Sequence, residues 1–479
     1  MTSVTHPHSP TPTGRTAAQR LGDWVAALAY EDLPEPVVEA AKLHAMDTIG
    51  VGIAGAVLPG EAATARTTVT LFGRMGGTAE ASVVGLPDRL PAAHAAFANG
   101  SLDHSIDFDD IDTDSRVHAS TIVTPAAFAM AERTGADGRE LIAALVAGNE
   151  VATRIGMGGP VHFQAHGFHA TLTAGVFGAA AGAARLLGLS GAATTNAFGI
   201  AGDTAGGLNA WIEKGTPNKH LHAGWAAHNG ILSADLAALG AEGPGTVFEG
   251  RFGLYEALTG YSDVDMSRVL DSLGADWETP SMAYKAYPSC YWMHGSLDAA
   301  REIRDRISGE VEQIDTITAI VPTSAVSIVL EPRETRILPL TPYAGKFSLQ
   351  YSVAAMLVRG EVDLDTYTTA RMADDTVLDL AARVEYAVSE KFDNGRQVYP
   401  GGLAVRMLDG REFVVEVPEP RGTELNPMSV DEVTAKFRST ASFGLADSDV
   451  AALEEALQNI ESPGSIGRAA EVLRRVRRR

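Results

Sequence analysis

A-G-V-F-G-A-A-A-G-A-A-R-L-L-G-L, residues 174–189, consists of small and apolar residues with a single charge at Arg185. The large apolar residues recur at helical spacing, and alanine and glycine fill the positions between them. Glycine costs about 1 kcal/mol relative to alanine inside a helix, so its repeated use indicates close contact between helices. The segment predicts a helix buried in a tightly packed bundle.

The same texture extends on both sides, from Ala17 to about Ser272. Several segments carry apolar residues at helical spacing and end at Gly, Pro or Asp. They are residues 36–54, 92–103, 122–134, 138–155 and 171–187. Within the first of these, residues 50–55 match G-x-G-x-x-G, but the preceding residues read as helix rather than strand, which favours packing glycines over a dinucleotide site.

The pattern changes after residue 272. Residues 314–322 and 383–388 are β-branched and alternating, and residues 403–417 predict a hairpin that turns at Asp409 and Gly410. Helical spacing recurs at residues 347–358 and 366–373, and again from Val430 onward. We therefore expect a mainly α protein: a large all-helical domain from residues 16–272 and 428–479, and a smaller α+β lid domain from residues 273–427.

Composition narrows the possible functions. The chain has 479 residues, 45% of them hydrophobic, and a net charge of -22, which argues against a nucleic-acid surface. Its single cysteine excludes an internal disulfide and a thiolate zinc cage. No apolar run predicts a membrane span, and residues 1–15 resemble a disordered leader rather than a signal peptide. We expect a cytoplasmic protein whose arginine-rich last residues form a solvated helix end.

Ten of the thirteen histidines lie between His94 and His294, mostly in short polar breaks. The densest break, L-D-H-S-I-D-F-D-D-I-D-T-D-S-R-V-H, spans residues 102–118 and holds five aspartates between Asp107 and Asp114. Ser115 replaces the glycine that a calcium loop requires, and Thr113 replaces the last aspartate of a magnesium-diphosphate motif. The interpretation that we favour is an active-site loop in which a buried aspartate orients His118; the alternative is a solvated acidic loop.

Three further segments hold candidate site residues. His169 follows His162 and His166 at spacings that could suit zinc, but Gly167 favours a loop that enters a helix, where an imidazole meets the positive helix end. Lys219 also precedes a helix and could bind an anion, although an ordinary exposed lysine is the alternative. Lys285 opens the second domain. No Cys-His motif surrounds Cys290, which favours a thiol that lines the pocket over a nucleophile.

Six motifs together resemble the MmgE/PrpD family, which includes 2-methylcitrate dehydratase, cis-aconitate decarboxylase and iminodisuccinate epimerase. They are spread in order through nearly the whole chain. They read M-D-T-I-G-V-G-I-A-G at residues 46–55, N-G-S-L-D-H-S-I-D-F-D-D at 99–110, G-F-H-A-T at 167–171, G-T-P-N-K-H-L-H-A-G at 215–224, Y-K-A-Y-P-S-C-Y-W-M-H-G at 284–295 and K-F-S-L-Q-Y at 346–351.

The resemblance implies a homodimer with a pocket between the two domains that uses no cofactor and no metal and takes a small polycarboxylate. It also assigns the site residues. The pocket aspartate falls on Asp107, the histidines on His118 and His169, the lysines on Lys219 and Lys285, and the tyrosine on Tyr351. Departures from the family pattern are Ile111, Ala119 and Cys290, which stands where the decarboxylases have a histidine.

The expected chemistry begins with removal of a proton beside a carboxylate. His118 and His169 would be base and acid, in either order, with Asp107 orienting an imidazole and Tyr351 protonating a leaving hydroxyl. Lys219 and Lys285 would hold carboxylates and stabilise the enolate. A dehydratase-type lyase of a substrate such as 2-methylcitrate is the first expectation. An iminodisuccinate-like epimerase, a cis-aconitate-type decarboxylase and a non-catalytic scaffold follow in that order.

Overall fold

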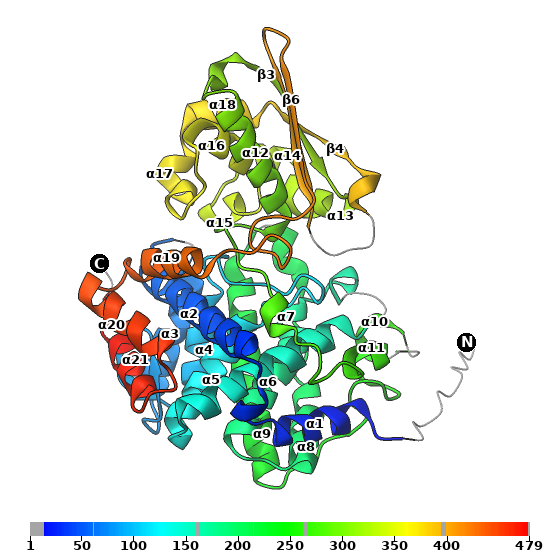
Figure 1. Ribbon diagram of the computed structural model, residues 1–479, viewed down its shortest axis with the longest axis vertical. Coiled ribbons are helices and arrows are strands. Elements are labelled where there is room, and N and C mark those ends of the chain that lie inside the picture. The colour runs from blue at the N-terminus through cyan, green and yellow to red at the C-terminus, as the bar shows by residue number, and fades with distance from the viewer. Residues whose placement is uncertain are drawn as a thin grey trace.

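The computed structural model describes residues 14–477 except 61, 160–162, 214, 262, 263, 265 and 394–398. A large helical domain carries a smaller domain of strands and helices on one side (Figure 1). The predicted mainly α architecture, with a smaller α+β part, is confirmed. Most of the predicted leader, the last two arginines and His162 lie outside the described residues.

Within its described residues, the helical domain has nine long α-helices and two short ones before the chain crosses to the lid. They are α1 (Ala17–Ala27), α2 (Glu35–Val57), α3 (Ala63–Met75), α4 (Ala92–Asp103), α5 (Ser120–Thr134), α6 (Gly138–Met157), α7 (Ala170–Leu186), α8 (Gly191–Gly202), α9 (His220–Ala238), α10 (Leu254–Thr259) and α11 (Ser267–Leu270). A short antiparallel hairpin, β1 (Ala81–Val83) and β2 (Leu86–Leu90), also belongs to this part of the chain and was not anticipated from the sequence.

Helix α7 contains most of the alanine- and glycine-rich segment and is buried from Ala170 through Ala184. Its glycines let α6 approach closely. A Cβ atom added at Gly178 would lie 2.6 Å from the Gly148 carbonyl oxygen and 2.7 Å from the Ala152 Cβ. The predicted buried helix is therefore confirmed, and the reason for its composition is the backbone contact with α6.

The lid is built on a four-stranded sheet in the order β4-β3-β5-β6. Its strands are β3 (Ile314–Val321), β4 (Val384–Val388), β5 (Gly401–Met407) and β6 (Glu412–Val417). β3 and β4 are parallel, and the other pairs are antiparallel. The predicted hairpin is confirmed as β5 and β6, with Gly410 at φ 89° in the turn.

The described part of the lid also contains seven α-helices, and two of them, α12 and α16, contribute most of the apolar residues that pack against the sheet. They are α12 (His294–Arg306), α13 (Thr323–Ala325), α14 (Arg333–Ile337), α15 (Pro342–Gly345), α16 (Leu349–Arg359), α17 (Thr369–Met372) and α18 (Asp375–Ala381). The lid thus has its own hydrophobic core, separate from that of the helical domain.

After the lid the chain returns to the helical domain as α19 (Val430–Ala441), α20 (Asp447–Gln458) and α21 (Ser465–Arg474). Helix α19 packs on α2, beside α20 and α21 (Figure 1). A Cβ at Gly50 would lie 2.6 Å from Thr440 Oγ1 and 3.0 Å from the Phe437 ring. Gly50, the first glycine of the G-x-G-x-x-G match, therefore lets α19 pack closely on α2, as expected for a packing glycine.

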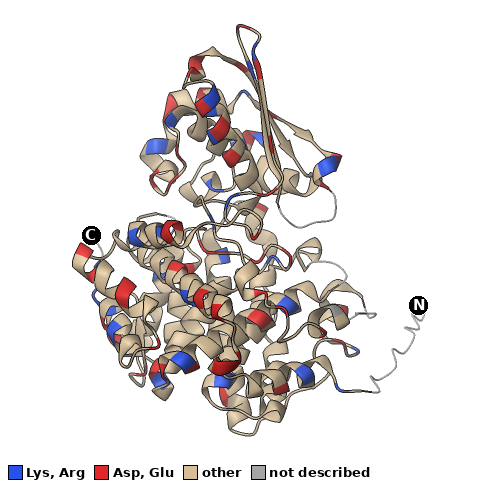
Figure 2. Cartoon of the chain, in the orientation of Figure 1, with Lys and Arg blue, Asp and Glu red and all other residues tan. Residues whose placement is uncertain are grey.

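Charge is distributed rather than gathered. Figure 2 shows acidic and basic residues interspersed along both domains in this view. Among the described helices, none combines the length and the low polarity that crossing a bilayer requires.

Candidate active site

The candidate site lies on the loop between α4 and α5, where the helical domain meets the segment that leads into the lid. Ile111 and Ala283 exchange two backbone hydrogen bonds, of 3.0 and 2.8 Å, which join the loop to that segment. Asp107 adopts a left-handed backbone conformation, with φ 52°. An aspartate tolerates this region better than most residues, but a left-handed non-glycine residue still marks a constrained turn.

Two buried lysines converge on Asp107. Lys219, at the N-cap of α9, places Nζ 2.7 Å from Asp107 Oδ1, and Lys285 Nζ lies 3.2 Å from the same oxygen. All three side chains are at most 5% exposed. Burial acts to raise the pKa of Asp107, but Lys219 and Lys285 outweigh it and hold the pKa well below its usual range. The structure brings together the aspartate and both lysines that the resemblance assigned.

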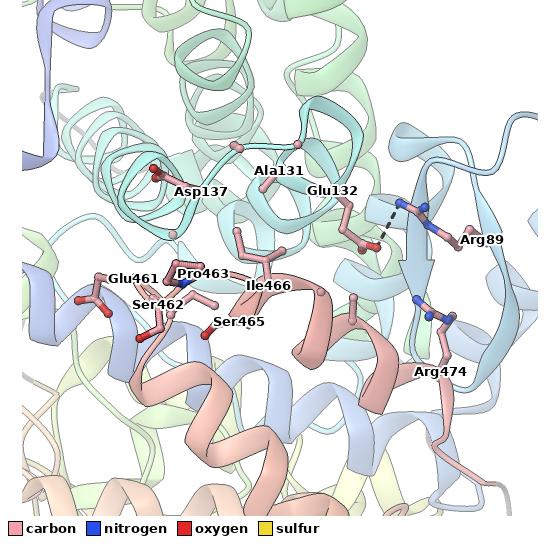
Figure 3. Close-up of a pocket in the computed structure, with 17 residues that line it drawn as sticks. Arg89, Ala131, Glu132, Asp137, Glu461, Ser462, Pro463, Ser465, Ile466 and Arg474 are labelled. Carbon is pink, nitrogen blue, oxygen red and sulfur yellow. Dashed lines mark ion pairs between the residues drawn. The ribbon is translucent and has the colours of Figure 1, made fainter.

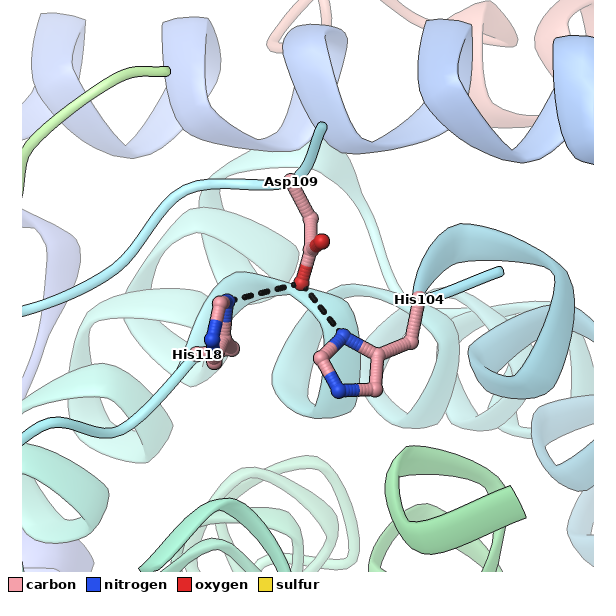
Figure 4. Close-up of side chains that lie close together, drawn as sticks. All are labelled: His104, Asp109 and His118. Atoms are coloured by element: carbon pink, nitrogen blue, oxygen red, sulfur yellow. Dashed lines mark hydrogen bonds and ion pairs between the residues drawn. The ribbon is translucent and has the colours of Figure 1, made fainter. Parts of the chain in front are cut away.

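The predicted contact between Asp107 and an imidazole is wrong, because Asp109 makes that contact instead (Figure 4). His104 Nδ1 donates to Asp109 Oδ2 at 2.7 Å, and His118 Nδ1 lies 3.0 Å from the same oxygen. Burial acts to raise the pKa of Asp109, but His104 and His118 outweigh this effect and hold the pKa well below its usual value, so the carboxylate is ionised. An ionised carboxylate only accepts hydrogen bonds, which leaves the lone pair of the His104 imidazole on Nε2.

His169 stands at the N-cap position of α7, where the sequence predicted a loop that enters a helix, and its ring extends the imidazole cluster. Its ring centroid lies 6.2 Å from that of His118 and 5.6 Å from that of His104, and its Nδ1 lies 3.0 Å from His222 Nδ1. Burial, followed by the charge interaction with His222, lowers the pKa of His169 well below its usual value. Burial also lowers the pKa of His104 to about 3 and that of His222 to about 4. These three imidazoles are neutral at pH 7.

Tyr351 does not join this cluster. It lies in α16, and its hydroxyl donates to the Thr366 carbonyl oxygen at 2.8 Å inside the lid. Burial raises its pKa. Among the described residues, its hydrogen bonds connect it to lid backbone and not to the histidines or lysines. The hydroxyl of Tyr351, the predicted proton donor, is therefore used in a hydrogen bond within the lid.

Cys290 is buried beside the lysines, and its amide donates to the Lys346 carbonyl oxygen at 2.9 Å. Burial, and secondly the charge of Asp107, raises the pKa of its thiol to about 11. A thiol that stays protonated is a poor nucleophile. The environment of Cys290 is consistent with a residue that lines the site.

Sequence reasoning missed His104, Asp109 and His222 as parts of the site. His104 and Asp109 stand in the same polar break, but the left-handed turn at Asp107, which aims neighbouring carboxylates in different directions, leaves no mark in the residue pattern. His222 follows Lys219 by three residues at the start of α9, so the predicted helix entrance already contained the signal.

His104, Asp109 and His118 also form a group whose ligand atoms could surround a metal ion. A tetrahedral zinc ion with bonds of about 2.0–2.1 Å keeps its ligand atoms roughly 3.3 Å apart. The two nitrogen–oxygen distances here, 2.7 and 3.0 Å, are shorter than that separation, and the first is a hydrogen bond. The geometry therefore fits a carboxylate that orients two imidazoles better than a metal site, and the absence of a metal requirement stays a prediction.

A separate surface cleft of about 620 Å³ lies where the α5–α6 connection meets α20 and α21 (Figure 3). Its arginines already have partners: Arg89 lies 3.4 Å from Glu132, and Arg474 donates to Ser82 Oγ at 2.6 Å. The cleft contains none of the clustered histidines. The buried loop between α4 and α5 is the stronger candidate for chemistry.

Comparisons with known proteins identify the family of the chain. The chain matches the MmgE/PrpD N-terminal domain over residues 19–267 and the MmgE/PrpD C-terminal domain over residues 287–462. It is 28% identical to a cis-aconitate decarboxylase-like protein oryM of Aspergillus oryzae, over 95% of this chain and 96% of that protein. It is 29% identical to the cis-aconitate decarboxylase of Homo sapiens over 91% and 90%, and 26% identical to that of Aspergillus terreus over 94% and 94%. The chain belongs to the MmgE/PrpD family.

Proposed function

We propose that the protein is a cofactor-independent lyase that removes water from a small di- or tricarboxylate such as 2-methylcitrate. The observation that carries this proposal is the pair of buried lysines beside a cluster of imidazoles. Lys219 and Lys285 carry two positive charges against the one negative charge of Asp107 in a buried site, where the excess positive charge binds carboxylates and stabilises an enolate strongly. A neutral imidazole can take the proton from the carbon beside a carboxylate.

His118 is the base in this proposal. Its Nδ1 faces the ionised Asp109, which stabilises the imidazolium that forms when Nε2 accepts a proton. The C–H bond breaks, and its proton goes to His118. The C–O bond then breaks, the electron pair of the enolate forms the alkene, and the departing hydroxide takes the proton from the His118 imidazolium. The sum is one alkene and one water.

His169 has a different role because its pKa is lowered and its Nδ1 is engaged with His222. A neutral imidazole at the N-terminus of α7 donates a hydrogen bond to a substrate oxygen without changing its charge. We therefore assign His169 to binding and orientation of the substrate.

A second candidate is a decarboxylase, and the names of the relatives favour it. That reaction breaks a C–C bond, releases carbon dioxide and then needs a proton for the carbanion. Against it stands Cys290, a residue that cannot deliver a proton as a histidine does, at the position where the resemblance places a histidine in decarboxylases. An epimerase would use the same proton abstraction but would form neither alkene nor water.

Product analysis separates these reactions. The purified protein is incubated in deuterated water with citrate, 2-methylcitrate, cis-aconitate and iminodisuccinate, and proton NMR follows the products while carbon dioxide is trapped. The dehydratase proposal expects an alkene without carbon dioxide. Carbon dioxide from cis-aconitate would support the decarboxylase instead, and deuterium exchange with inversion alone would support the epimerase. Dialysis against EDTA before the assay tests the prediction that no metal is required.

We also propose that the protein is a homodimer that uses an exposed apolar face of α9 and α3. Trp225, Leu232 and Leu236 lie along one side of α9 and are 42–47% exposed, and Leu71 and Met75 of the neighbouring α3 are 54% and 60% exposed. Monomers rarely expose contiguous apolar surface of this kind, and a symmetric dimer would cover it on both copies. Sedimentation should give twice the chain mass, and Leu236→Glu should shift the protein toward monomer. A parent protein that sediments as a monomer would contradict the proposal.

A further inference from the structure

Three consecutive backbone carbonyls of the site loop each accept a hydrogen bond from a different buried lysine. Lys346 Nζ donates to the Ile106 oxygen at 2.8 Å, Lys285 Nζ to the Asp107 oxygen at 2.9 Å, and Lys436 Nζ to the Phe108 oxygen at 2.7 Å. The exposed fractions of these lysines are 0%, 1% and 7%. Burying an ammonium group is costly unless it is fully paired, so three such groups on one tripeptide call for an explanation.

The three lysines come from separate parts of the chain. Lys346 follows α15 in the lid, Lys285 lies in the segment that leads into the lid, and Lys436 lies in α19, after the lid. Each also binds a second oxygen. Lys346 donates to the Pro288 oxygen at 2.9 Å, Lys436 lies 2.9 Å from Asp47 Oδ2, and Lys285 is paired with the Asp107 carboxylate. The loop is thus held from the lid, from the crossing segment and from the helical domain at once.

The loop needs such support because it makes a turn that local sequence does not stabilise. The left-handed Asp107 directs its carboxylate to the lysines, whereas Asp109, two residues later, reaches the imidazoles. Asp110 then binds His44 Nδ1 at 2.6 Å on α2. Buried carbonyls must find donors, and here the donors are side chains rather than a neighbouring strand or helix.

We propose that Lys346 and Lys436 are positioning residues for the reaction: they fix the turn at residues 106–108 so that Asp107 faces the cations and Asp109 faces His118. Their effect on catalysis rests on the proposed function; their effect on the loop does not. Since Lys346 belongs to the lid, the loop reaches its working geometry only when the lid is docked. Opening of the lid therefore disassembles the site as well as exposing it.

The test compares Lys346→Met and Lys436→Met with Lys391→Met. Methionine keeps most of the side-chain length and removes the charge, and Lys391 is a lid lysine whose side chain is 70% exposed in an ion pair with Glu416. Amide hydrogen exchange is measured by mass spectrometry on peptides that cover residues 104–118, and on peptides of α6 and α7 as an internal reference. Turnover and KM are measured on the substrate that the product screen identifies.

We expect exchange in residues 104–118 to accelerate at least tenfold in Lys346→Met and Lys436→Met, with α6 and α7 unchanged. Turnover should fall by roughly tenfold to a hundredfold, with a smaller change in KM, because a displacement of about 1 Å at reacting groups has effects of this size. Lys391→Met should match the parent in every measurement. A purely structural lysine would lower the melting temperature without changing turnover per folded molecule, and that result would overturn the proposal.

Two further outcomes keep the test decisive. If Lys346→Met does not fold, Lys346→Arg takes its place, because arginine retains a donor for the two carbonyls. The loop amides of Lys346→Arg should then exchange at the parent's rate. The inference would be overturned if those amides exchanged fast in Lys346→Arg while the loop amides of Lys436→Met exchanged as in the parent. If the parent turns over none of the polycarboxylates, the proposed function fails, and the exchange measurement alone decides whether the lysines hold the loop.

Discussion

The crossing of α6 and α7 and the seam between the two domains are both buried, but they bury opposite kinds of atoms. At the crossing, glycine backbones and alanine methyl groups touch. The seam buries lysines and aspartates that are each at most 7% exposed, among them Lys219, Lys285, Lys346, Lys436, Asp47, Asp107, Asp109 and Asp110. Apolar burial stabilises the fold directly, whereas buried charges persist only where each has partners. We therefore expect the reaction to take place at the seam, where charged side chains are buried at a cost in stability.

The largest expected effect is loss of activity at the seam. His118→Ala and Asp109→Asn should each lower turnover roughly a hundredfold or more, the usual size of a lost general base or of its orienting partner. Steady-state kinetics on the substrate from the product screen measures this. His166→Ala, at an exposed histidine outside the cluster, is the control. Parent-like rates in folded His118→Ala would remove His118 from the mechanism.

Breaking a buried charge pair should cost stability as well. Lys219→Met leaves the Asp107 carboxylate with one lysine, and we expect a loss of about 3 kcal/mol in the free energy of unfolding. The double variant Lys219→Met, Asp107→Asn should not recover that loss, because it leaves the buried Lys285 without its carboxylate partner. Urea unfolding gives both values. Binding of a simple dicarboxylate, measured by calorimetry, should weaken in Lys219→Met.

The imidazoles predict a pH effect of intermediate size. The folded pKa of His222 is about 4, below the unfolded value of about 6.5, so the unfolded chain takes up the proton first as the pH falls. Stability that His222 contributes above pH 6.5 is therefore lost as the pH falls toward 4. Relative to His222→Gln, the parent should lose about 2 kcal/mol between pH 7.5 and pH 5.

Thermal and urea unfolding at both pH values measure this difference. His166→Gln, at an exposed histidine, should show the same pH dependence as the parent. If His222→Gln also follows the parent, the imidazole is not held neutral by its environment.

The smallest expected effect concerns the crossing of α6 and α7. Gly178→Ala would bring a methyl group to 2.6 Å from the Gly148 oxygen, and the strain should exceed the gain in helix propensity by about 1 kcal/mol. Gly73→Ala, in α3, meets only Leu86 at 4.0 Å and should stabilise the protein by up to about 1 kcal/mol. Opposite signs in urea unfolding would confirm the difference, and equal signs would contradict it.

The sequence predicted the helical bundle, the β5–β6 hairpin and the segments that hold the site, because periodicity and turn residues reflect local energetics. It also indicated that Asp107, Lys219 and Lys285 belong together, through the resemblance. It could not predict which aspartate meets the imidazoles, since this depends on the left-handed Asp107. Nor could it assign Lys346 or Lys436 to the loop, because their contacts span 240 and 328 residues.

Helix α19 follows the lid in the chain but completes the helical domain. A ribosome therefore makes α2 and the loop of residues 106–108 long before it makes Lys436. Until α19 is synthesised, the Asp47 carboxylate and the Phe108 carbonyl lack Lys436 as a partner, and the surface of α2 around Gly50 is not covered by α19. Translation thus imposes an order on assembly: the lid is synthesised first, and Lys436, which binds the loop of residues 106–108, is synthesised afterwards.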